Sequence, residues 1–246
     1  MDDDWDFYPC RVDDAPASIF VNLALADQLQ ELRENTLYAV RIEMVVGDTH
    51  GMGSSEEADA LYPAEAALVA DLSALAIRFV GRLRNRGVWQ LTCMGPPHLE
   101  PEVKRLAGIH LRGLQRQFST LAQMDPEWTY FTDFLLPSEE RMRWIEDRRV
   151  VDSLQRRGDS LAQQRRVDHW VYFPDRDSRS AFASMVVDDG FQLLDSLGEA
   201  PDFGVQVYRT DSVRLDDIHE VTGFLTKLAE RFDGKYDGWE TSVEVE

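Results

Sequence analysis

Cysteine and long apolar runs are both scarce in this sequence of 246 residues. The two cysteines, Cys10 and Cys93, lie in separate apolar, strand-like stretches. Such isolated thiols do not form a secreted disulfide framework, so we expect both to be reduced and buried. No segment approaches the roughly 18 apolar residues that span a bilayer, and the N-terminus lacks the basic and apolar regions of a signal peptide. These absences predict a cytoplasmic protein with no membrane partner.

Signatures of catalysis are missing as well. No metal-ligand spacing such as H-x-H or H-E-x-x-H links the five histidines, which are His50, His98, His110, His169 and His219. No serine lies in a G-x-S-x-G elbow. Gly51–Ser55 could hold a phosphate on its backbone amides, but Glu56 and Glu57 follow where the anion would bind, which favours a plain helix cap. We therefore expect no catalytic residues, no metal and no cofactor, and a protein that is not an enzyme.

Positive charge is also in short supply. The chain has 26 lysines and arginines against 45 acidic residues, a net charge of −19. The acidity is shared about evenly between the two halves of the chain. Such a charge repels phosphate backbones and anionic lipids, so we expect no direct contact with nucleic acid and favour a basic protein surface as partner.

One local exception to this acidity is an arginine cluster at 78–86, formed by Arg78, Arg82, Arg84 and Arg86. On a strand, the first three would share a face. They could bind an acidic segment or pair with nearby carboxylates. Internal pairing is the favoured interpretation.

The first half of the chain mixes two periodicities. Alternating apolar residues predict strands, at 38–44, 79–83, 89–93 and 128–136. Helical spacing of apolar residues predicts a helix that opens at Ser54–Glu57 and another from Pro101 to Phe118. With one more strand near the N-terminus, the order is a strand followed by β-α-β-β-α-β.

The second half repeats this order after an initial helix. A boundary is expected at Pro137–Glu140, where a strand ends and acidic residues favour a helix N-terminus. Strands are predicted at 167–173, 191–194, 203–208 and 240–246. One helix is predicted to end at Gly190 and another to span Ile218 to Phe232.

Both halves therefore predict the same α+β fold class. We expect two ferredoxin-like (β-α-β-β-α-β) domains with antiparallel sheets, at residues 1–137 and 138–246. Each should have four or five strands, with two helices on one face.

The most distinctive string is residues 232–241. Here Asp237-Gly238 is expected to form a tight turn with a positive φ at the glycine, which would hold Tyr236 and Trp239 side by side. The two aromatic residues either close the end of the core or form part of a binding surface.

The string Tyr236-Asp237-Gly238-Trp239-x-Thr241 resembles the C-terminal signature of the family called regulator of ribonuclease E activity B. The order of the preceding segments fits that family as well, at 148–152, 167–170, 190–191 and 229–233. The first half, beginning Trp5-Asp6-Phe7-Tyr8, resembles a bacterial domain of unknown function that often precedes such a module.

This resemblance implies a ferredoxin-like domain that binds ribonuclease E and alters messenger RNA decay, and it brings no catalytic residues. The protein partner would meet the last strand and the adjoining sheet face. The residues expected there are Tyr236, Asp237, Gly238, Trp239, Glu240, Thr241 and Trp170. The oligomeric state is left open.

Two other functions stay open at this point. A small-molecule-binding regulatory module would hold its ligand at the interface of the two domains. A hydrolase would use carboxylates such as Asp211 and Asp237. Recovery of the nuclease or of a retained metabolite from a lysate would discriminate between a protein-binding regulator and a ligand-binding one.

Overall fold

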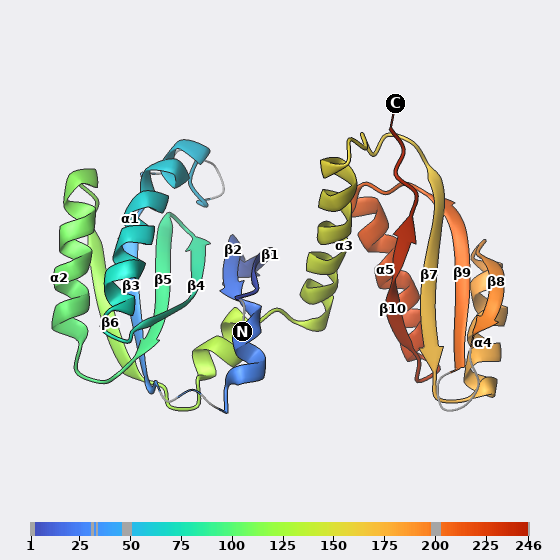
Figure 1. Ribbon diagram of the computed structural model, residues 1–246, viewed down its shortest axis with the longest axis horizontal. Coiled ribbons are helices and arrows are strands. Elements are labelled where there is room, and N and C mark those ends of the chain that lie inside the picture. Colours follow the sequence, from blue (N-terminus) through green and yellow to red (C-terminus); the bar gives the residue numbers. More distant parts are fainter. Residues whose placement is uncertain (1–2, 31, 33, 46–50, 198–202, 246) are drawn as a thin grey trace. The chain divides into compact units, whose positions relative to one another are not determined.

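The computed structural model describes residues 3–30, 32, 34–45, 51–197 and 203–245, without the side chains of 195–197. The chain divides into two compact units, Met1–Pro137 and Ser138–Glu246, and each is described by itself (Figure 1). Within the described residues, no helix combines the length and apolarity that crossing a membrane requires.

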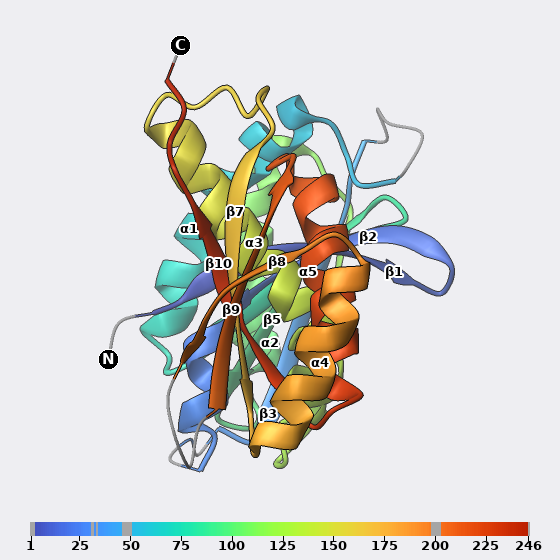
Figure 2. The same ribbon diagram turned by 90° about the vertical axis from the view of Figure 1, so that its right-hand side faces the viewer.

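The second unit contains one four-stranded antiparallel sheet in the order β10-β7-β9-β8. Its elements are α3 (Glu139–Arg156), β7 (Arg165–Phe173), α4 (Arg176–Asp188), β8 (Gln192–Leu197), β9 (Phe203–Asp211), α5 (Leu215–Glu230) and β10 (Lys235–Thr241). Numbered from β7, the sheet order is 4-1-3-2, which is the ferredoxin-like order. Helices α4 and α5 lie on the same side of this sheet (Figure 2).

Alternation along β7 decides which sheet face the helices cover. Val167, His169, Val171 and Phe173 are buried, while the intervening Asp168, Trp170 and Tyr172 are half-buried on the opposite face. The buried residues of α5 recur every three or four positions and pack on this face. The core of the unit therefore lies between the sheet and helices α4 and α5.

Helix α3 is an addition to the ferredoxin-like plan. It begins at its N-cap Ser138, whose hydroxyl accepts a hydrogen bond from the Arg141 N–H, and it has Glu139 and Glu140 in its first turn. It packs against α5, and Val151 and Leu154 join a small core that also contains Trp239.

The first unit has a six-stranded antiparallel sheet in the order β1-β2-β4-β5-β3-β6. Its strands are β1 (Trp5–Val12), β2 (Ala15–Asn22), β3 (Thr36–Glu43), β4 (Arg78–Asn85), β5 (Val88–Gly95) and β6 (Phe118–Met124), and its helices are α1 (Ser55–Ser73) and α2 (Glu100–Leu111). Strands β3 to β6 alone have the 4-1-3-2 order. The β1–β2 hairpin extends this ferredoxin-like sheet beyond β4.

Each face of the six-stranded sheet is covered in part, by different segments of the chain. Helices α1 and α2 pack over β3 to β6, on residues such as Val40, Trp89 and Leu91. The segment 125–136 packs beneath the hairpin on the other face, where the Tyr8 hydroxyl donates to the Leu135 carbonyl over 2.9 Å. The hairpin is therefore an integral part of the unit.

The fold class agrees with the prediction, but three predicted elements of the first unit are wrong. The sheet has six strands, two more than the ferredoxin-like plan, because the N-terminal segment forms a hairpin. Helix α2 ends at Leu111, and Gln115 adopts a left-handed φ of 52°, so Phe118 begins β6 instead of closing a helix. The predicted strand at 128–136 contains a helical turn at Phe131–Leu135, because its buried residues Trp128, Phe131 and Leu135 have helical spacing.

The end of the second unit also differs from the prediction. The last strand is Lys235–Thr241 rather than 240–246, and Glu246 lies outside the described residues. The tight turn falls at Asp233, with a φ of 53°, and Gly234 N–H donates to the Ala229 carbonyl. Asp237-Gly238 instead forms a β-bulge within β10, where Gly238 does have the positive φ expected of it, 139°.

Candidate protein-binding groove

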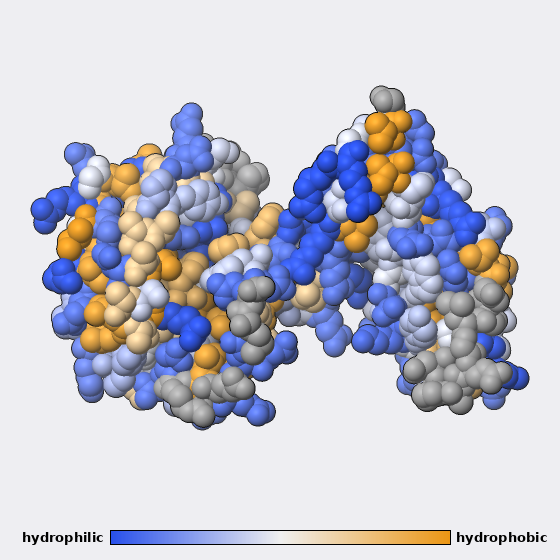
Figure 3. Space-filling model, in the orientation of Figure 1, coloured by the Kyte–Doolittle hydropathy of each residue, from blue (hydrophilic) through white to orange (hydrophobic). Residues whose placement is uncertain are grey.

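A groove of about 760 Å³ separates α3 from the edge strand β10. Thr226 and Glu230 of α5 contribute to its wall. The groove lining includes six carboxylates, Glu139, Glu146, Asp147, Glu230, Asp237 and Glu240, and two basic residues, Arg143 and Lys235. Apolar contact surface comes from Met142, Val150 and two tryptophans. Figure 3 shows hydrophilic residues gathered over α3.

Six of the seven site residues predicted from the sequence line this groove; Thr241 does not. They belong to both faces of the sheet. Tyr236 and Trp239 pair with Val171 and His169 and share the helix-covered face, whereas Gly238 and Glu240 pair with Trp170 and Asp168 on the other face. The groove reaches both faces at Gly238, where a Cβ atom would have no neighbour within 4 Å. Thr241 is used internally, since its hydroxyl donates to the Arg166 carbonyl over 2.7 Å.

Trp239 is mostly buried, with 9% of its surface exposed, and forms part of the small core under α3. Its indole Nε1–H donates to Asp147 Oδ1 over 2.9 Å. Trp239 therefore has a structural role at the groove. This agrees with the first of the two interpretations, in which its side chain closes the end of the core.

Asp147 is the residue at this site that the sequence reasoning missed. Only 2% of its surface is exposed, and its Oδ2 lies 2.8 Å from both His219 Nδ1 and Thr222 Oγ1 of α5. One carboxylate thus joins α3, α5 and β10. The sequence signal was an acidic residue close to Ile145 and Val151 in a helix whose apolar stripe was irregular.

Burial alters the ionisation of the groove residues. Desolvation raises the pKa of Asp147, against the hydrogen bonds from His219, Thr222 and Trp239 that lower it. Partial burial also raises the pKa of Glu146, and the neighbouring Asp147 adds to this. A cation bound next to these carboxylates would lower both pKa values.

The buried His169 and the half-buried Tyr236 form a polar pair under α5. His169 Nδ1 lies 2.9 Å from the Tyr236 hydroxyl, and His169 is fully buried. Burial lowers the pKa of His169 to about 3, and the nearby Arg209 contributes; burial likewise raises the pKa of Tyr236 well above its usual range. Both side chains are therefore neutral at physiological pH; His169 lies in the core, and Tyr236 packs against the core.

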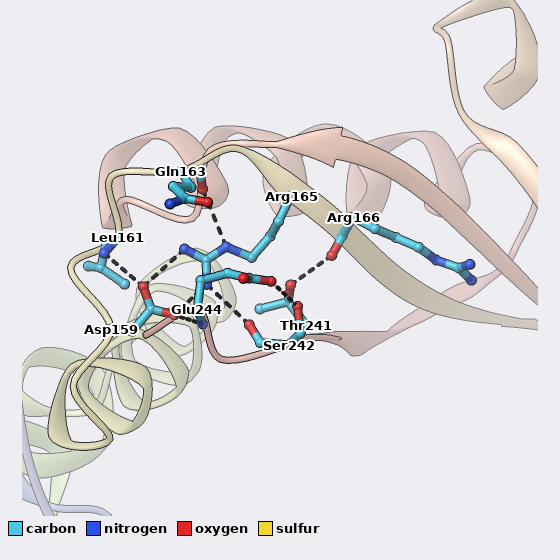
Figure 4. A network of polar contacts seen from close by, with 8 residues as sticks. All are labelled: Asp159, Leu161, Gln163, Arg165, Arg166, Thr241, Ser242 and Glu244. Atoms are coloured by element: carbon cyan, nitrogen blue, oxygen red, sulfur yellow. Dashed lines mark hydrogen bonds and ion pairs between the residues drawn. The ribbon is translucent and has the colours of Figure 1, made fainter. Parts of the chain in front are cut away.

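A separate polar network anchors the C-terminal segment (Figure 4). The buried Asp159 makes a bidentate ion pair with Arg165 and accepts hydrogen bonds from the Leu161 and Glu244 N–H groups, over 2.8 and 2.9 Å. Arg165 also donates to the Ser242 carbonyl over 3.1 Å. Each Asp159 oxygen has two donors, so this network stabilises the fold and offers no free group to a ligand.

The arginine cluster of the first unit pairs internally. Arg82 bonds Glu65 at 2.6 Å, Arg78 bonds Glu34 at 3.2 Å, and Arg84 donates to the Met52 carbonyl. Arg82 and Arg84 share a sheet face, but a register shift between Phe79 and Gly81 separates Arg78 from them. An acidic partner segment has no unpaired arginine to bind among these three.

The groups proposed for other chemistry do not converge. In the described part of the chain, no three His, Cys, Asp or Glu side chains form a metal-binding group, and His50 lies outside that part. Asp211 pairs with Arg209, whereas Asp237 lies on the β10 bulge at the groove. Asp168 and His169 face opposite sides of β7, as neighbours in a strand must. Cys93 is buried, which raises the pKa of its thiol, whereas Cys10 is only half-buried, contrary to the expectation.

Fold and site together define a protein of two ferredoxin-like domains, the second with an acidic groove at a sheet edge. The chain belongs to the Family of unknown function (DUF695), which matches residues 3–136. The family Regulator of ribonuclease activity B matches residues 144–241. Both resemblances noted in the sequence are thereby confirmed, the second one by a match over most of the second unit. Neither family description names a catalytic activity.

The remaining comparisons give no functional argument. No curated protein matches the chain. An unknown protein from Galdieria sulphuraria is 10% identical, with 85% of this chain and 99% of that one covered and a TM-score of 0.24. An aminoacylhistidine dipeptidase from Vibrio alginolyticus is 11% identical, with 85% and 40% covered and a TM-score of 0.24. Scores this low carry no argument about the fold of this chain.

Proposed function

We propose that this protein is a non-catalytic regulator that binds a ribonuclease through the groove between α3 and β10. The partner segment would be basic and extended. The resemblance of the second unit makes ribonuclease E the first candidate, and messenger RNA decay the process affected.

The observation that carries this proposal is the charge of the groove. Its six carboxylates outnumber its two basic side chains, within a chain whose net charge is −19. Arginine-rich segments that bind RNA have the complementary charge, and long-range attraction would speed their encounter with the groove, more strongly at low salt.

The free edge of β10 suits an extended guest. Among the described residues, β10 pairs only with β7, so its outer backbone groups face the groove side of the sheet edge. A guest strand could add main-chain hydrogen bonds there, while its basic side chains meet Glu146, Glu230 and Asp237. A basic segment held in this way cannot contact RNA, so inhibition would follow from competition.

The test is binding of the full chain to purified ribonuclease E, measured by isothermal titration calorimetry at two salt concentrations. The triple variant Glu146→Gln, Glu230→Gln and Asp237→Asn removes three groove charges. We expect it to weaken binding at least tenfold at low salt, because charge-assisted contacts at an interface are worth about 1.5–3 kcal/mol each when well formed.

A matched control removes the same charge elsewhere in the unit, at the exposed Asp177, Asp188 and Asp216, each changed to Asn. This control should keep most of the affinity of the parent chain. Absence of binding by the parent chain would refute the ribonuclease E assignment. An equal loss of binding affinity in the two triple variants would show that net charge, and not the groove, drives association.

A further inference from the structure

The first unit contains a second cavity, of about 600 Å³, which is independent of the groove in the second unit. It lies on the helix-covered side of the sheet, between α1 and the β1–β2 hairpin. Helix α1 packs over β4 but makes few contacts with β1 or β2, so the hairpin face beside it is left uncovered. The cavity exists because the hairpin widens the sheet beyond the reach of the two helices.

One wall of this cavity is a stack of three aromatic rings. Trp5 stacks on Phe20, with ring centroids 4.9 Å apart, and on Phe79, with centroids 5.1 Å apart. The interplanar angles are 17° and 19°. The three residues come from β1, β2 and the start of β4, and all are half-buried. Opposite them, α1 and the loop after it contribute small and aliphatic side chains such as Ala66, Val69 and Ile77.

Three carboxylates line the same cavity, and two of them already have cationic partners. Glu34 pairs with Arg78 at 3.2 Å. Glu65 pairs with Arg82 at 2.6 Å and accepts a hydrogen bond from Trp89 Nε1 over 2.6 Å. Burial nevertheless raises the pKa of Glu65 above its usual value, so desolvation outweighs these contacts.

Asp3 is the third carboxylate, and its charge is not balanced by a cation in the described part of the chain. Its Oδ1 accepts a hydrogen bond from the neutral side-chain amide of Asn22 over 2.8 Å. An uncompensated negative charge therefore lies beside an accessible aromatic stack. A carboxylate near aromatic rings is the chemistry that attracts organic cations. The Phe20 ring already has the Arg82 guanidinium 4.7 Å from its centroid, so Asp3 is the group left for a cationic ligand.

We infer that the cavity of the first unit binds a small organic monocation that carries a flat apolar group. The flat group would pack against the Trp5, Phe20 and Phe79 wall, and the ammonium or guanidinium group would meet Asp3. The volume and lining of this cavity are those of a ligand site, since such sites measure about 300–1,000 Å³ and are lined mainly by apolar and aromatic residues with a few convergent polar groups. The chain would then bind a metabolite through its first unit and a nuclease through its second.

Other ligand classes fit less well. An anion would meet Asp3 without a free cation to bind it, since Arg78 and Arg82 are engaged by Glu34 and Glu65. A neutral aromatic compound would contact the rings and leave the charge of Asp3 without a counter-charge. The charge of the ligand is therefore the property that separates these alternatives.

The test uses three probes of similar shape and different charge: phenethylamine, 2-phenylethanol and 3-phenylpropionate. Each is titrated into the full chain and followed by calorimetry and by the NMR shift of the Trp5 indole. We expect phenethylamine to bind three- to tenfold more tightly than 2-phenylethanol, as a cation beside a ring and an exposed carboxylate would. 3-Phenylpropionate should bind most weakly.

Two isosteric variants locate the charge. Asp3→Asn should abolish the preference for phenethylamine over 2-phenylethanol, whereas Asp59→Asn, at an exposed position on α1 outside the cavity, should preserve it. Equal affinity for the three probes, no binding of phenethylamine, or a preference that survives Asp3→Asn would each overturn the proposal. A basic side chain of a partner protein as the true ligand would also overturn it, and would appear as binding of arginine-containing peptides without binding of phenethylamine.

Discussion

The indole Nε1–H of Trp239 donates to Asp147 Oδ1 over 2.9 Å, across a separation of 92 residues in the chain. The same Asp147 side chain lies within hydrogen-bonding distance of His219 and Thr222. The added helix α3 is therefore fixed to the ferredoxin-like unit by one buried acceptor as well as by apolar packing. This geometry holds α3 in place as one wall of the groove.

Trp239→Phe should keep most of the apolar packing and remove the donor to Asp147. We expect the free energy of unfolding to fall by about 1–3 kcal/mol, because a buried carboxylate oxygen loses its hydrogen bond. Chemical denaturation followed by circular dichroism measures this. Trp170→Phe is the control, at a half-buried position on the other sheet face, and should have a smaller effect. Equal effects of the two changes would contradict a structural role of the Asp147 bond.

His169 should make the second unit sensitive to acid. Its pKa falls to about 3 in the folded protein, from an ordinary value of 6.5, mainly because it is buried. The native state thus holds His169 neutral, and stability from this residue is complete above pH 6.5 and is lost as the pH falls toward 3. In His169→Gln, which cannot titrate, the free energy of unfolding should decline less steeply between pH 6.5 and 4. Parallel pH profiles for the two proteins would refute this assignment.

Asp159→Asn should be more destabilising than a change at an ion pair that is only partly buried. The change leaves Arg165 buried without its carboxylate, at a cost of about 3–5 kcal/mol. Asp152→Asn, which breaks the half-buried i,i+4 pair with Arg148 on α3, should cost less than about 1 kcal/mol. Urea denaturation at neutral pH compares the two variants, and similar midpoints would count against the buried network.

The same network predicts a pH dependence of known sign. Arg165 lowers the pKa of Asp159 below its ordinary value of 3.8. The contribution of Asp159 to stability is therefore present above that value and is lost as the pH falls through the lower folded-state pKa. The difference in stability between the parent chain and Asp159→Asn should shrink in this acid range, which denaturation at several pH values can detect.

Glu65 and Arg82 should show strong energetic coupling. Both are nearly buried, and the Arg82 guanidinium also lies over the rings of Phe20 and Trp89. Each single change, Glu65→Gln or Arg82→Met, leaves one buried group without its partner. The double variant should therefore be more stable than the sum of the single changes predicts, by about 0.5–3 kcal/mol in a double-mutant cycle. Additive effects would show that the pair acts as two independent residues.

The fold class was predictable because its signals are local. Strand alternation in 167–173 and helical spacing in 218–229 survive in the structure almost unchanged. The errors arose where one pattern admits two structures. Trp128, Phe131 and Leu135 are apolar within a short aromatic run, and only tertiary packing beneath the hairpin decides that they belong to a helical turn.

The chain end shows a second limit of sequence patterns. Asp237-Gly238 is a good turn sequence, but Gly234 is the position that tolerates no side chain, since a Cβ there would lie 2.2 Å from Phe173 Cε1. Close approach of this kind is invisible in a sequence. The turn accordingly falls four residues earlier than the dipeptide suggested, and Gly238 accommodates a bulge.

Only the residues of the family signature pointed to the groove from the sequence. Tyr236 to Glu240 were identified by resemblance, yet α3, which forms the opposite wall, belongs to no ferredoxin-like plan. Asp147 was missed because its role depends on hydrogen-bond partners that lie 72 to 92 residues away in the chain. Such long-range partners cannot be read from local spacing.

The buried Asp159–Arg165 pair has a practical consequence for dissecting this protein. The match to the ribonuclease-regulating family ends at residue 241. Two later backbone groups nevertheless bind this pair: the Ser242 carbonyl accepts a hydrogen bond from Arg165, and the Glu244 N–H donates one to Asp159. A chain shortened at Thr241 by the family boundary would expose two buried charges to water at the end of β10. Fragments meant to represent the second unit should therefore extend through residue 245, and fusion partners at the C-terminus need a spacer beyond it.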